Sequence, residues 1–561
     1  MHSRFDEINK YGDPCSRKQI KENKCYGGFA RMKQAAKDAA KSALKQNIST
    51  VFINAGDTFQ GTSYYSVFKR KIVAPLIDSL QLDVMSLGTH EFDDGIDNLV
   101  EYLNQIKTPV VACNFNISTE KRLNLTNLTP SRIVNASGEM IGIIGYLTPD
   151  TTIKSRTENL EIFDEIPNIR AEAKRLKSNG IKIIIALGHS GFNFDRKLAA
   201  QVNEISMVVG GYSHTLQYTP KEPSPSNEKA TEKYPYVVVQ KSGKKVPVVQ
   251  AYAYTKYLGK LMVTFDDAGN VISAKGNPIQ LDYMIKKDAD VEKLVASWST
   301  LLQNELNTVI GYTRVLLKKT DYSEREFESN IGNMITDAMI DSVVHIAKKK
   351  NLTNWSNAPI AVYPNSEIKS VIKNTKPEGA ITLADLLKVL PSNNQLFTSR
   401  ISGSTLKFFL EFSVSEYETR RNNSLYNFLP YFVNFSGLKI NFNFTEEPYN
   451  RINSIMMVCD QCSIPKYEAI DEDKIYNVIT GFFIKDGDDT FYKYKNYISS
   501  SEKLGITDTE CVFSYIKKMK IVYPILEGRI QISGMDKSFS VGGVHISCTL
   551  LFICSFISYF K

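Results

Sequence analysis

Short apolar runs that alternate with longer segments of helical periodicity constrain the fold of this chain more than any other feature. The runs are rich in β-branched residues and recur between residues 50 and 281, at 51–54, 109–112, 140–145, 182–186 and 206–210. Short runs of this kind, separated by helical segments, are typical of strands in a layered α/β domain. We therefore expect an α/β fold in which the loops at the strand ends carry the chemistry.

The length of the chain predicts more than one domain. With 561 residues, 43% of them hydrophobic, it can form more than one core. Residues 288–309 keep apolar positions at i, i+3 and i+4, which predicts an amphipathic helix between two α/β units. In the second unit we expect helices near 330–348 and 382–389 and a strand at 360–363. The expected organisation is a first domain at 1–285, a connecting helix at 286–310, a second domain at 311–533 and a tail at 534–561.

Glycosylation sequons and cysteine spacing indicate passage through the secretory pathway. Cys15 and Cys25 are close together in a loop-like segment, and Cys459 and Cys462 could close a small ring, so we expect two local disulfides. Cys113 and Cys511 are expected to be free, buried thiols. Asn-X-Ser/Thr sequons occur at Asn47, Asn116, Asn124, Asn127, Asn135, Asn351, Asn354, Asn422, Asn434 and Asn443.

The two ends of the chain differ in their targeting signals. Residues 1–5 have neither the basic nor the apolar region of a signal peptide, so we expect the natural chain to extend further upstream. At the other end, a polar spacer at 536–540 and an apolar run at 544–560 have the layout of a GPI-attachment signal. A transmembrane helix or an interfacial segment is the alternative interpretation of this run.

Histidine and aspartate residues at the predicted strand ends form the candidate reactive site. Asp57 follows a predicted strand among small residues and is placed to bridge two divalent ions, which bind imidazole nitrogen and carboxylate oxygen. His90 and Asp93 are three residues apart, so the carboxylate can orient an imidazole that stabilises charge on a phosphoryl group. Helix capping alone also explains that spacing. The histidines that fall in these first-domain motifs, four of the six in the chain, are His2, His90, His189 and His214.

Several other function classes have no specific support in the sequence. The net charge of +8 is spread over the whole chain, and the basic run at 348–350 lacks the interleaved aromatic residues typical of nucleic-acid binding. We therefore expect no nucleic-acid partner. The chain has no Gly-X-Ser-X-Gly elbow and no Walker loop, and residues 486–489 lack the full ligand spacing of an EF-hand.

Together these motifs resemble, in order and over essentially the whole chain, those of the 5′-nucleotidase/apyrase family of metallophosphoesterases. In the first half they are His-Ser-Arg-Phe at 2–5, Gly-Gly-Phe-Ala-Arg at 27–31, Asn-Ala-Gly-Asp at 54–57, the run at 88–93, Leu-Gly-His-Ser-Gly at 187–191 and Gly-Gly-X-Ser at 210–213. In the second half they are the runs at 328–333, 402–406, 486–491 and 527–533.

The resemblance implies a metal site for two divalent ions, with zinc as the expected metal, in a four-layer αββα domain. It also implies a nucleotide site in a smaller α/β domain, joined to the first by a long helix. It implies a domain rotation that carries the substrate phosphate to the ions. The catalytic pair would be His90 and Asp93, and Ser533 would carry the lipid. The metal ligands would be His2, Asp57, His189 and His214, and the nucleotide contacts Arg325, Lys369, Phe483 and Asp489.

Some positions depart from the pattern of the family. Thr89 replaces a metal-binding Asn and Tyr212 replaces a metal-binding His, and a neutral tyrosine is a poor zinc ligand. Lys369 replaces a bidentate Arg, and Ser392 replaces one of two aromatic residues that stack on the base. We therefore expect a weakened second metal site and a lower affinity for nucleotide.

The expected function is extracellular, metal-dependent hydrolysis of nucleoside 5′-monophosphates such as AMP, at the cell surface or in secreted form, with a possible homodimer. Two alternatives stay open. One is a catalytically degenerate relative that binds nucleotides or a partner, and the other is an apyrase acting on ATP or ADP.

Overall fold

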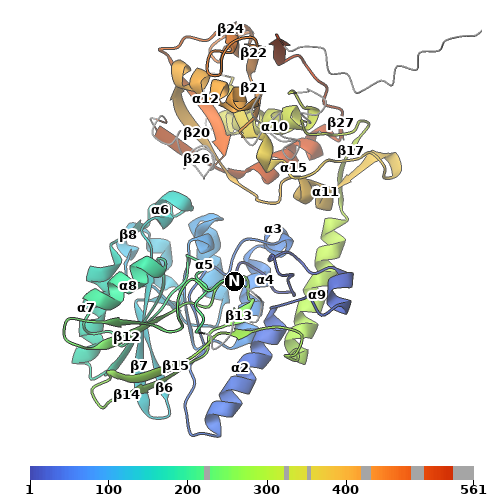
Figure 1. Ribbon diagram of the computed structural model, residues 1–561. Helices are drawn as coiled ribbons and strands as arrows, with labels where there is room; N and C mark the ends of the chain where they lie inside the picture. The colour runs from blue at the N-terminus through green and yellow to red at the C-terminus, as the bar shows by residue number, and fades with distance from the viewer. Residues whose placement is uncertain are drawn as a thin grey trace, which may run out of the picture. The chain divides into compact units, whose positions relative to one another are not determined.

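The computed structural model describes residues 1–219, 228–320, 327–349, 355–417, 431–481, 498 and 500–534. The chain divides into two compact units, Met1–Thr308 and Val309–Lys561, each with cores of its own (Figure 1). Both units combine β-sheets with covering helices, which confirms the expected two-domain α/β class. Among the described residues, no helix combines the length and apolar character needed to cross a bilayer.

Two sheets packed face to face form the centre of the first unit. One sheet is entirely parallel, in the order β1 (Ile53–Asn54), β2 (Val84–Ser86), β3 (Val110–Val111) and β5 (Leu128–Thr129). The other has the order β11 (Tyr236–Val239), β12 (Lys245–Val249), β10 (Met207–Val209), β9 (Ile183–His189), β7 (Glu139–Leu147) and β6 (Ser131–Ala136), with antiparallel strands only at its two edges. Val84, Val111, Ile143, Ile185 and Leu187 form the core between the sheets.

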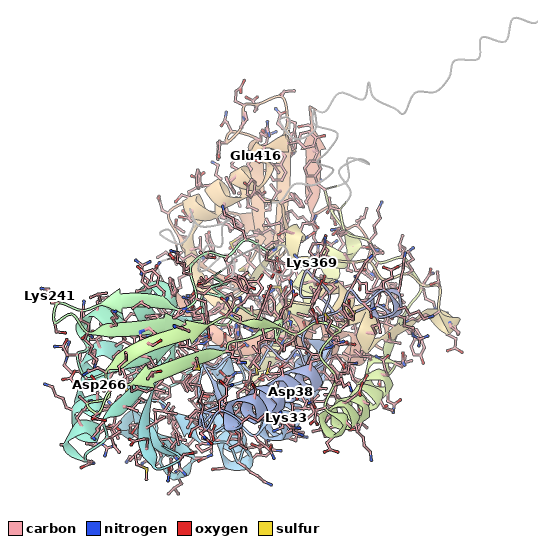
Figure 2. All side chains as sticks on the ribbon, turned by 60° about the horizontal axis from the view of Figure 1, so that its bottom comes forward. Lys33, Asp38, Lys241, Asp266, Lys369 and Glu416 are labelled. Carbon is pink, nitrogen blue, oxygen red and sulfur yellow. A yellow bond between two sulfur atoms is a disulfide. The ribbon has the colours of Figure 1, made fainter. Side chains whose placement is uncertain are left out.

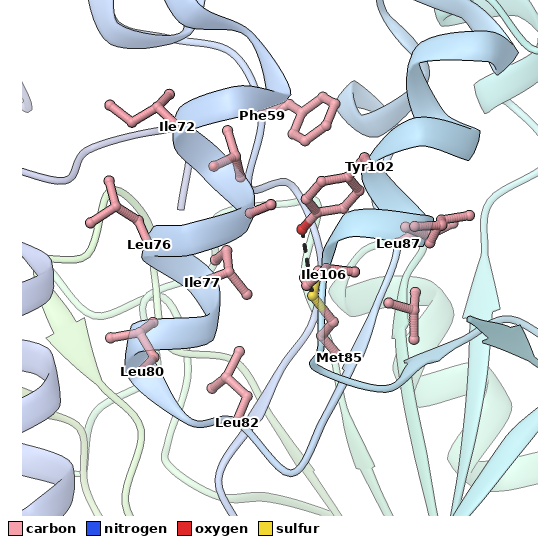
Figure 3. Packing of buried hydrophobic residues seen from close by; sticks show 14 of the residues in the cluster. Phe59, Ile72, Leu76, Ile77, Leu80, Leu82, Met85, Leu87, Tyr102 and Ile106 are labelled. Carbon is pink, nitrogen blue, oxygen red and sulfur yellow. Dashed lines mark hydrogen bonds between the residues drawn. The ribbon is translucent and has the colours of Figure 1, made fainter. Parts of the chain in front are cut away.

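Helices cover the outer face of each sheet. The first sheet packs against α2 (Phe29–Leu44), α4 (Arg70–Leu80), α5 (Gly95–Gln105) and α9 (Ala289–Leu306). Figure 3 shows this core, in which the hydroxyl of Tyr102 donates to the sulfur of Met85 at 3.8 Å. The second sheet packs against α7 (Glu165–Ser178) and α8 (Phe192–Gln201). The layers therefore run helix, sheet, sheet, helix.

The helix expected at 286–310 is α9, and it packs against α2, α3 (Ser63–Phe68) and α4 of the first unit. Asp288 caps it by accepting a hydrogen bond from the backbone nitrogen of Val291 at 3.1 Å. The remaining elements of the first unit are α1 (Arg17–Lys21), η1 (His90–Phe92), η2 (Ile117–Thr119), η3 (Lys121–Leu125), α6 (Thr151–Lys154), β4 (Phe115–Asn116), β8 (Glu161–Ile162), β13 (Tyr257–Leu258), β14 (Leu261–Phe265), β15 (Val271–Gly276) and β16 (Ile279–Gln280).

The second unit is built on a five-stranded sheet with apolar cores on both faces. Its order is β21 (Val433–Ser436), β18 (Ile360–Pro364), β25 (Ile475–Gly481), β20 (Gln395–Ser402) and β26 (Ser500–Thr507). Alternate residues of β18 enter different cores: Ile360 and Val362 pack with α12 (Gly403–Ser415), and Ala361 and Tyr363 pack with α10 (Asn330–Lys349) and α15 (Asp508–Met519).

Two smaller sheets complete the second unit. One has the order β19 (Ala380–Thr382), β17 (Val309–Thr313) and β27 (Ile521–Val522). The other has the order β24 (Tyr467–Ala469), β23 (Ile452–Val458), β22 (Leu438–Asn443) and β28 (Ile530–Ser533). The short helices are α11 (Leu383–Val389), η5 (Asn365–Glu367) and η6 (Pro377–Gly379).

Cys15 is bonded to Cys25 and Cys459 to Cys462, whereas Cys113 and Cys511 are free thiols. Cys511 is buried and Cys113 is partly buried.

One sequon does not suit glycosylation: Asn434 lies in β21 with only 3% of its surface exposed, because β21 packs inside the second unit. Asn47, Asn124 and Asn135 are exposed, and Asn351, Asn354 and Asn422 lie outside the described residues.

Candidate metal centre

The candidate residues of the first unit come together at the carboxyl ends of parallel strands in both sheets. Asp57 follows β1, His90 follows β2, His189 ends β9 and His214 follows β10. The carboxyl ends of parallel strands lie at one edge of a sheet, so the packing of the two sheets brings these loops together. His2 joins them because its backbone nitrogen donates to the carbonyl oxygen of Asp57 at 2.8 Å.

Asp57 is the centre of the cluster and is only 5% exposed. Its Oδ2 lies 2.9 Å from Nε2 of His189 and 3.6 Å from Nε2 of His2, and its Oδ1 accepts a hydrogen bond from the backbone nitrogen of His90 at 3.0 Å. Burial acts to raise the pKa of Asp57, but the neighbouring His189 and His90 lower it well below its usual range. The residue is therefore a carboxylate at neutral pH, as a metal ligand must be.

His2 and His214 present two imidazole nitrogens to the same point. Their Nε2 atoms are 3.0 Å apart, and burial lowers the pKa of both residues, that of His214 to about 4. Both rings are therefore neutral and have lone pairs available to a metal. Two imidazole nitrogens beside a carboxylate oxygen form a donor set that suits a divalent ion such as zinc. Ligand atoms of His2, Asp57 and His90 all lie within 4.8 Å of one another, and His214 adjoins this group through His2, so the cluster is a candidate site for one ion.

His189 is oriented by the backbone. Its Nδ1 lies 2.7 Å from the carbonyl oxygen of Ala55, to which it donates, so Nε2 faces Asp57. Burial acts to lower the pKa of His189, but Asp57 raises it. Nε2 of His189 is buried and makes no hydrogen bond with any described residue, and Oδ2 of Asp57 lies 2.9 Å away. A buried imidazole nitrogen without a partner, beside a carboxylate, is a candidate ligand for a divalent ion, which binds the neutral form of the ring.

His90 and Asp93 form the expected pair. Nδ1 of His90 lies 2.8 Å from Oδ2 of Asp93, and the hydroxyl of Ser155 donates to Oδ1 of Asp93 at 2.7 Å. Burial acts to lower the pKa of His90, but Asp93 and Asp57 raise it to about 10. His90 is therefore a cation at neutral pH, and its side chain is still 37% exposed.

The side chains at the two substituted positions, Thr89 and Tyr212, form hydrogen bonds with the short helix α6 and not with Asp57. Oγ1 of Thr89 lies 3.1 Å from Oγ1 of Thr151, at the start of α6, and the hydroxyl of Tyr212 accepts a hydrogen bond from Nζ of Lys154, at its end. The ring of Tyr212 contacts His189 edge to face, with centroids 5.6 Å apart. The protein ligands left for a second ion are Asp57 and His189, which do not form a complete site.

A cavity of about 350 Å³ adjoins these groups. His2, Asp57, His189, Tyr212 and His214 line one part of it, and apolar side chains from both sheets, including Ile53, Ile185 and Val249, line the rest. Such apolar surroundings strengthen the electrostatic interactions within a metal site.

Three contributors to the site were missed by the sequence analysis: Glu91, Tyr254 and the α6 region. Glu91 is fully buried and accepts hydrogen bonds from the backbone nitrogens of Asp57, Thr58 and Gly88, so it joins the loops after β1 and β2. The sequence signal that could have identified Glu91 is its position next to His90, in the motif at 88–93. Tyr254 packs against the rings of His2 and His214, and no local pattern marks it.

The nucleotide-site predictions concern the second unit, and most of them lie outside the described residues: Arg325, Phe483 and Asp489. Lys369 is among the described residues and is labelled in Figure 2. Its Nζ donates to the carbonyl oxygen of Ser366 and lies 3.3 Å from Oε1 of Glu367. The hydroxyl of Ser392 donates to Oε2 of the same glutamate at 3.3 Å. The two substituted positions Lys369 and Ser392 are therefore neighbours around Glu367.

Ser533, the predicted lipid-attachment residue, is the last residue of β28 and pairs with Asn443 of β22. The apolar run at 544–560 lies outside the described residues.

Replacing Glu91 with glutamine should lower the free energy of unfolding by about 1–3 kcal/mol, because the amide group turns a donor toward buried N–H groups that need an acceptor. Urea denaturation of the purified protein measures the change. Glu139→Gln is the matched control, since Glu139 is exposed at the start of β7. Equal stability of the two variants would contradict this role of Glu91.

Comparison with known proteins identifies two family domains. Residues 1–216 match the calcineurin-like phosphoesterase model, and residues 309–496 match the model of the 5′-nucleotidase C-terminal domain. Among solved structures, a 5′-nucleotidase precursor from Thermus thermophilus is similar with a TM-score of 0.57 and 28% identity, covering 95% of this chain and 98% of that one.

Curated relatives match over nearly the whole length of the chain. Protein 5NUC of Lutzomyia longipalpis is 39% identical over 541 residues, which are 96% of this chain and 92% of that protein. The 5′-nucleotidase of Mus musculus is 34% identical, covering 95% of this chain and 89% of the mouse protein. The snake venom 5′-nucleotidase of Naja atra is 35% identical, with coverage of 95% and 97%. Two family domains in the same order and identities above 30% over nearly the full length establish that this chain belongs to the 5′-nucleotidase family of metallophosphoesterases.

Proposed function

We propose that this protein hydrolyses nucleoside 5′-monophosphates, AMP above all, to a nucleoside and inorganic phosphate. The observation that carries the proposal is the geometry around Asp57. One carboxylate oxygen faces imidazole nitrogens of His2 and His189, and the other accepts from the backbone of the cationic His90. The relatives from Mus musculus and Naja atra are named 5′-nucleotidases, and this donor set suits phosphoryl chemistry.

His2, Asp57 and His214 would hold a divalent ion, and zinc suits their nitrogen and oxygen donors. That ion would supply Lewis-acid polarisation of a phosphoryl oxygen. The reaction adds water across the ester: a bond from the water oxygen to phosphorus forms, and the bond from phosphorus to the 5′ oxygen breaks.

His90 would hold a proton at Nε2, where it stabilises the charge that develops on the phosphoryl oxygens. Asp93 would accept a hydrogen bond from Nδ1, the other nitrogen of the ring, and so keep His90 charged and oriented. In the second unit, Lys369 would contribute a point charge to nucleotide binding, together with Arg325, Phe483 and Asp489.

A catalytically degenerate binding protein is the second candidate, and one observation favours it: Thr89 and Tyr212 bond to α6 in place of a metal. Phosphate release by the purified protein in zinc and in chelator distinguishes the candidates. Including ADP and ATP in the same assay tests the apyrase alternative. Zinc-dependent release from AMP supports the enzyme, and the absence of release from a folded, zinc-loaded protein supports the binder.

His90→Ala should lower kcat for AMP by at least about 100-fold, because the charge that stabilises the phosphoryl group is lost. The circular dichroism spectrum should not change, since this half-exposed ring is not part of the core. His345→Ala is the control, because His345 is exposed on α10 in the second unit. Full turnover by His90→Ala would contradict the proposed role of His90 in stabilising the phosphoryl group.

Asp93→Asn should shift the alkaline limb of the activity profile to lower pH. The raised pKa of His90, about 10, means that the charged form persists below that pH and is lost as the pH rises through it. Removing the Asp93 charge lowers this pKa, so the decline should begin about 1–3 pH units earlier. Profiles of kcat/KM for AMP between about pH 6 and pH 11 measure the shift. The control is Asp97→Asn, because Asp97 is an exposed aspartate on α5. Coincident profiles would contradict the pairing.

The protein is also proposed to act outside the cell, with a lipid anchor at Ser533. Local disulfides, exposed sequons and the apolar run at 544–560 support this location. Phosphatidylinositol-specific phospholipase C should release the protein from intact cells, and retention of the protein after treatment would contradict a GPI anchor. Sedimentation of the released protein tests the proposed homodimer.

A further inference from the structure

The turn that contains α6 contacts three loops of the candidate metal centre. Thr151 lies at hydrogen-bond distance from Thr89, Lys154 donates to Tyr212, and Ser155 donates to Asp93. Two of these contacts involve the positions at which the chain departs from its family, and the third supports the proposed catalytic pair. At both substituted positions, the side chain therefore forms a hydrogen bond with this one short segment, where the family has a metal ligand.

Lys154 is held at Tyr212 by a hydrogen bond. Its Nζ donates to the phenolic oxygen and lies 4.8 Å from the centroid of the ring, beyond the hydroxyl and close to the ring plane. The carboxylate of Asp150, 3.8 Å from Nζ, is a more distant partner and is itself 63% exposed. The ring of Tyr212 lies against His189, so Tyr212 connects Lys154 to the part of the site that contains His189.

The loop that carries Tyr212 is held in place by the protein. Tyr212 and His214 have φ values of 75° and 49°, which are uncommon for residues with a side chain. Gln250 stabilises this conformation by donating to the carbonyl oxygen of Gly211 and accepting from the backbone nitrogen of Thr215. The buried Asp195 accepts a further hydrogen bond from Gln250 at 2.8 Å. The position of the phenol is therefore fixed by contacts within the fold.

We propose that this chain binds one divalent ion, through His2, Asp57 and His214, and that the ammonium of Lys154, held by Tyr212, replaces the second ion. An ammonium group and a divalent cation repel each other, so Lys154 disfavours an ion between Asp57 and His189. In its place Lys154 supplies positive charge to a bound phosphate or phosphate monoester. This inference rests on the proposed function, because it concerns the same phosphate-binding site.

Metal stoichiometry is the primary test. The purified full chain is stripped with a chelator, dialysed and titrated with zinc by calorimetry, and bound zinc is counted by mass spectrometry. The expected result is one ion per chain. A variant with Thr89→Asn, Tyr212→His and Lys154→Met together should bind a second ion. Two ions of similar affinity in the unaltered chain would overturn the proposal.

Binding of inorganic phosphate to the zinc-loaded protein tests the role of Lys154 directly. Lys154→Met should weaken phosphate binding by about tenfold, whereas Lys154→Arg should largely retain it. Lys174→Met is the matched control, because Lys174 is an exposed lysine on α7. Unchanged phosphate affinity in Lys154→Met would overturn the charge-replacement role.

These measurements separate the inference from the proposed function. One bound zinc, with phosphate affinity that depends on Lys154 but without hydrolysis of AMP, would support the inference and refute the enzyme. Hydrolysis of AMP by a protein that binds two zinc ions would support the enzyme and refute the inference.

Discussion

The buried carboxylate of Asp57 is the interaction on which the rest of the metal centre depends. A carboxylate removed from water is costly unless it is paired, and Asp57 is surrounded by two imidazoles and a backbone N–H group. The glycines around it are required by this close approach: a Cβ atom on Gly88 would lie 2.3 Å from Oδ1 of Asp57. The burial of Asp57, its charged neighbours and the glycines around it thus depend on one another.

A second buried carboxylate, that of Glu91, holds the backbone around the first. It satisfies N–H groups of two loops that come from different strands, and so it fixes the distance between Asp57 and the turn that carries His90. Several residues at the site also have left-handed backbone conformations, including His2, Asp57, Tyr212, His214 and Tyr254. Each such conformation costs about 1–3 kcal/mol and persists only where surrounding contacts determine it, which is typical of functional sites.

The substitutions at Thr89 and Tyr212 have a common structural consequence. Each places a hydroxyl where the family has a metal ligand, and each hydroxyl contacts a residue of α6, from 62 and 58 positions away in the chain. The residues proposed to hold one ion, His2, Asp57 and His214, lie next to one another and are not involved in these contacts. The proposed catalytic pair, His90 and Asp93, is hydrogen-bonded, and Ser155 donates a further hydrogen bond to Asp93.

The sequence by itself determined the local features. Alternation of apolar runs with helical segments predicted the α/β class, the helix at 288–309 and the strand at 360–363, because periodicity of 2 or 3.6 residues is visible within one segment. Short spacing predicted both disulfides and the pairing of His90 with Asp93. Strand-end motifs predicted which histidines gather, because parallel strands present their carboxyl ends at one edge.

Only the tertiary structure decided which distant residues meet. Thr89 and Thr151 are 62 positions apart, and their contact depends on how elements distant in sequence pack together, which no local pattern specifies. The burial of Asn434, the contact of Lys154 with Tyr212 and the role of Tyr254 have the same origin. A local pattern specifies the kind of element and the chemistry at its end, whereas the partner of each side chain depends on how elements far apart in sequence pack together.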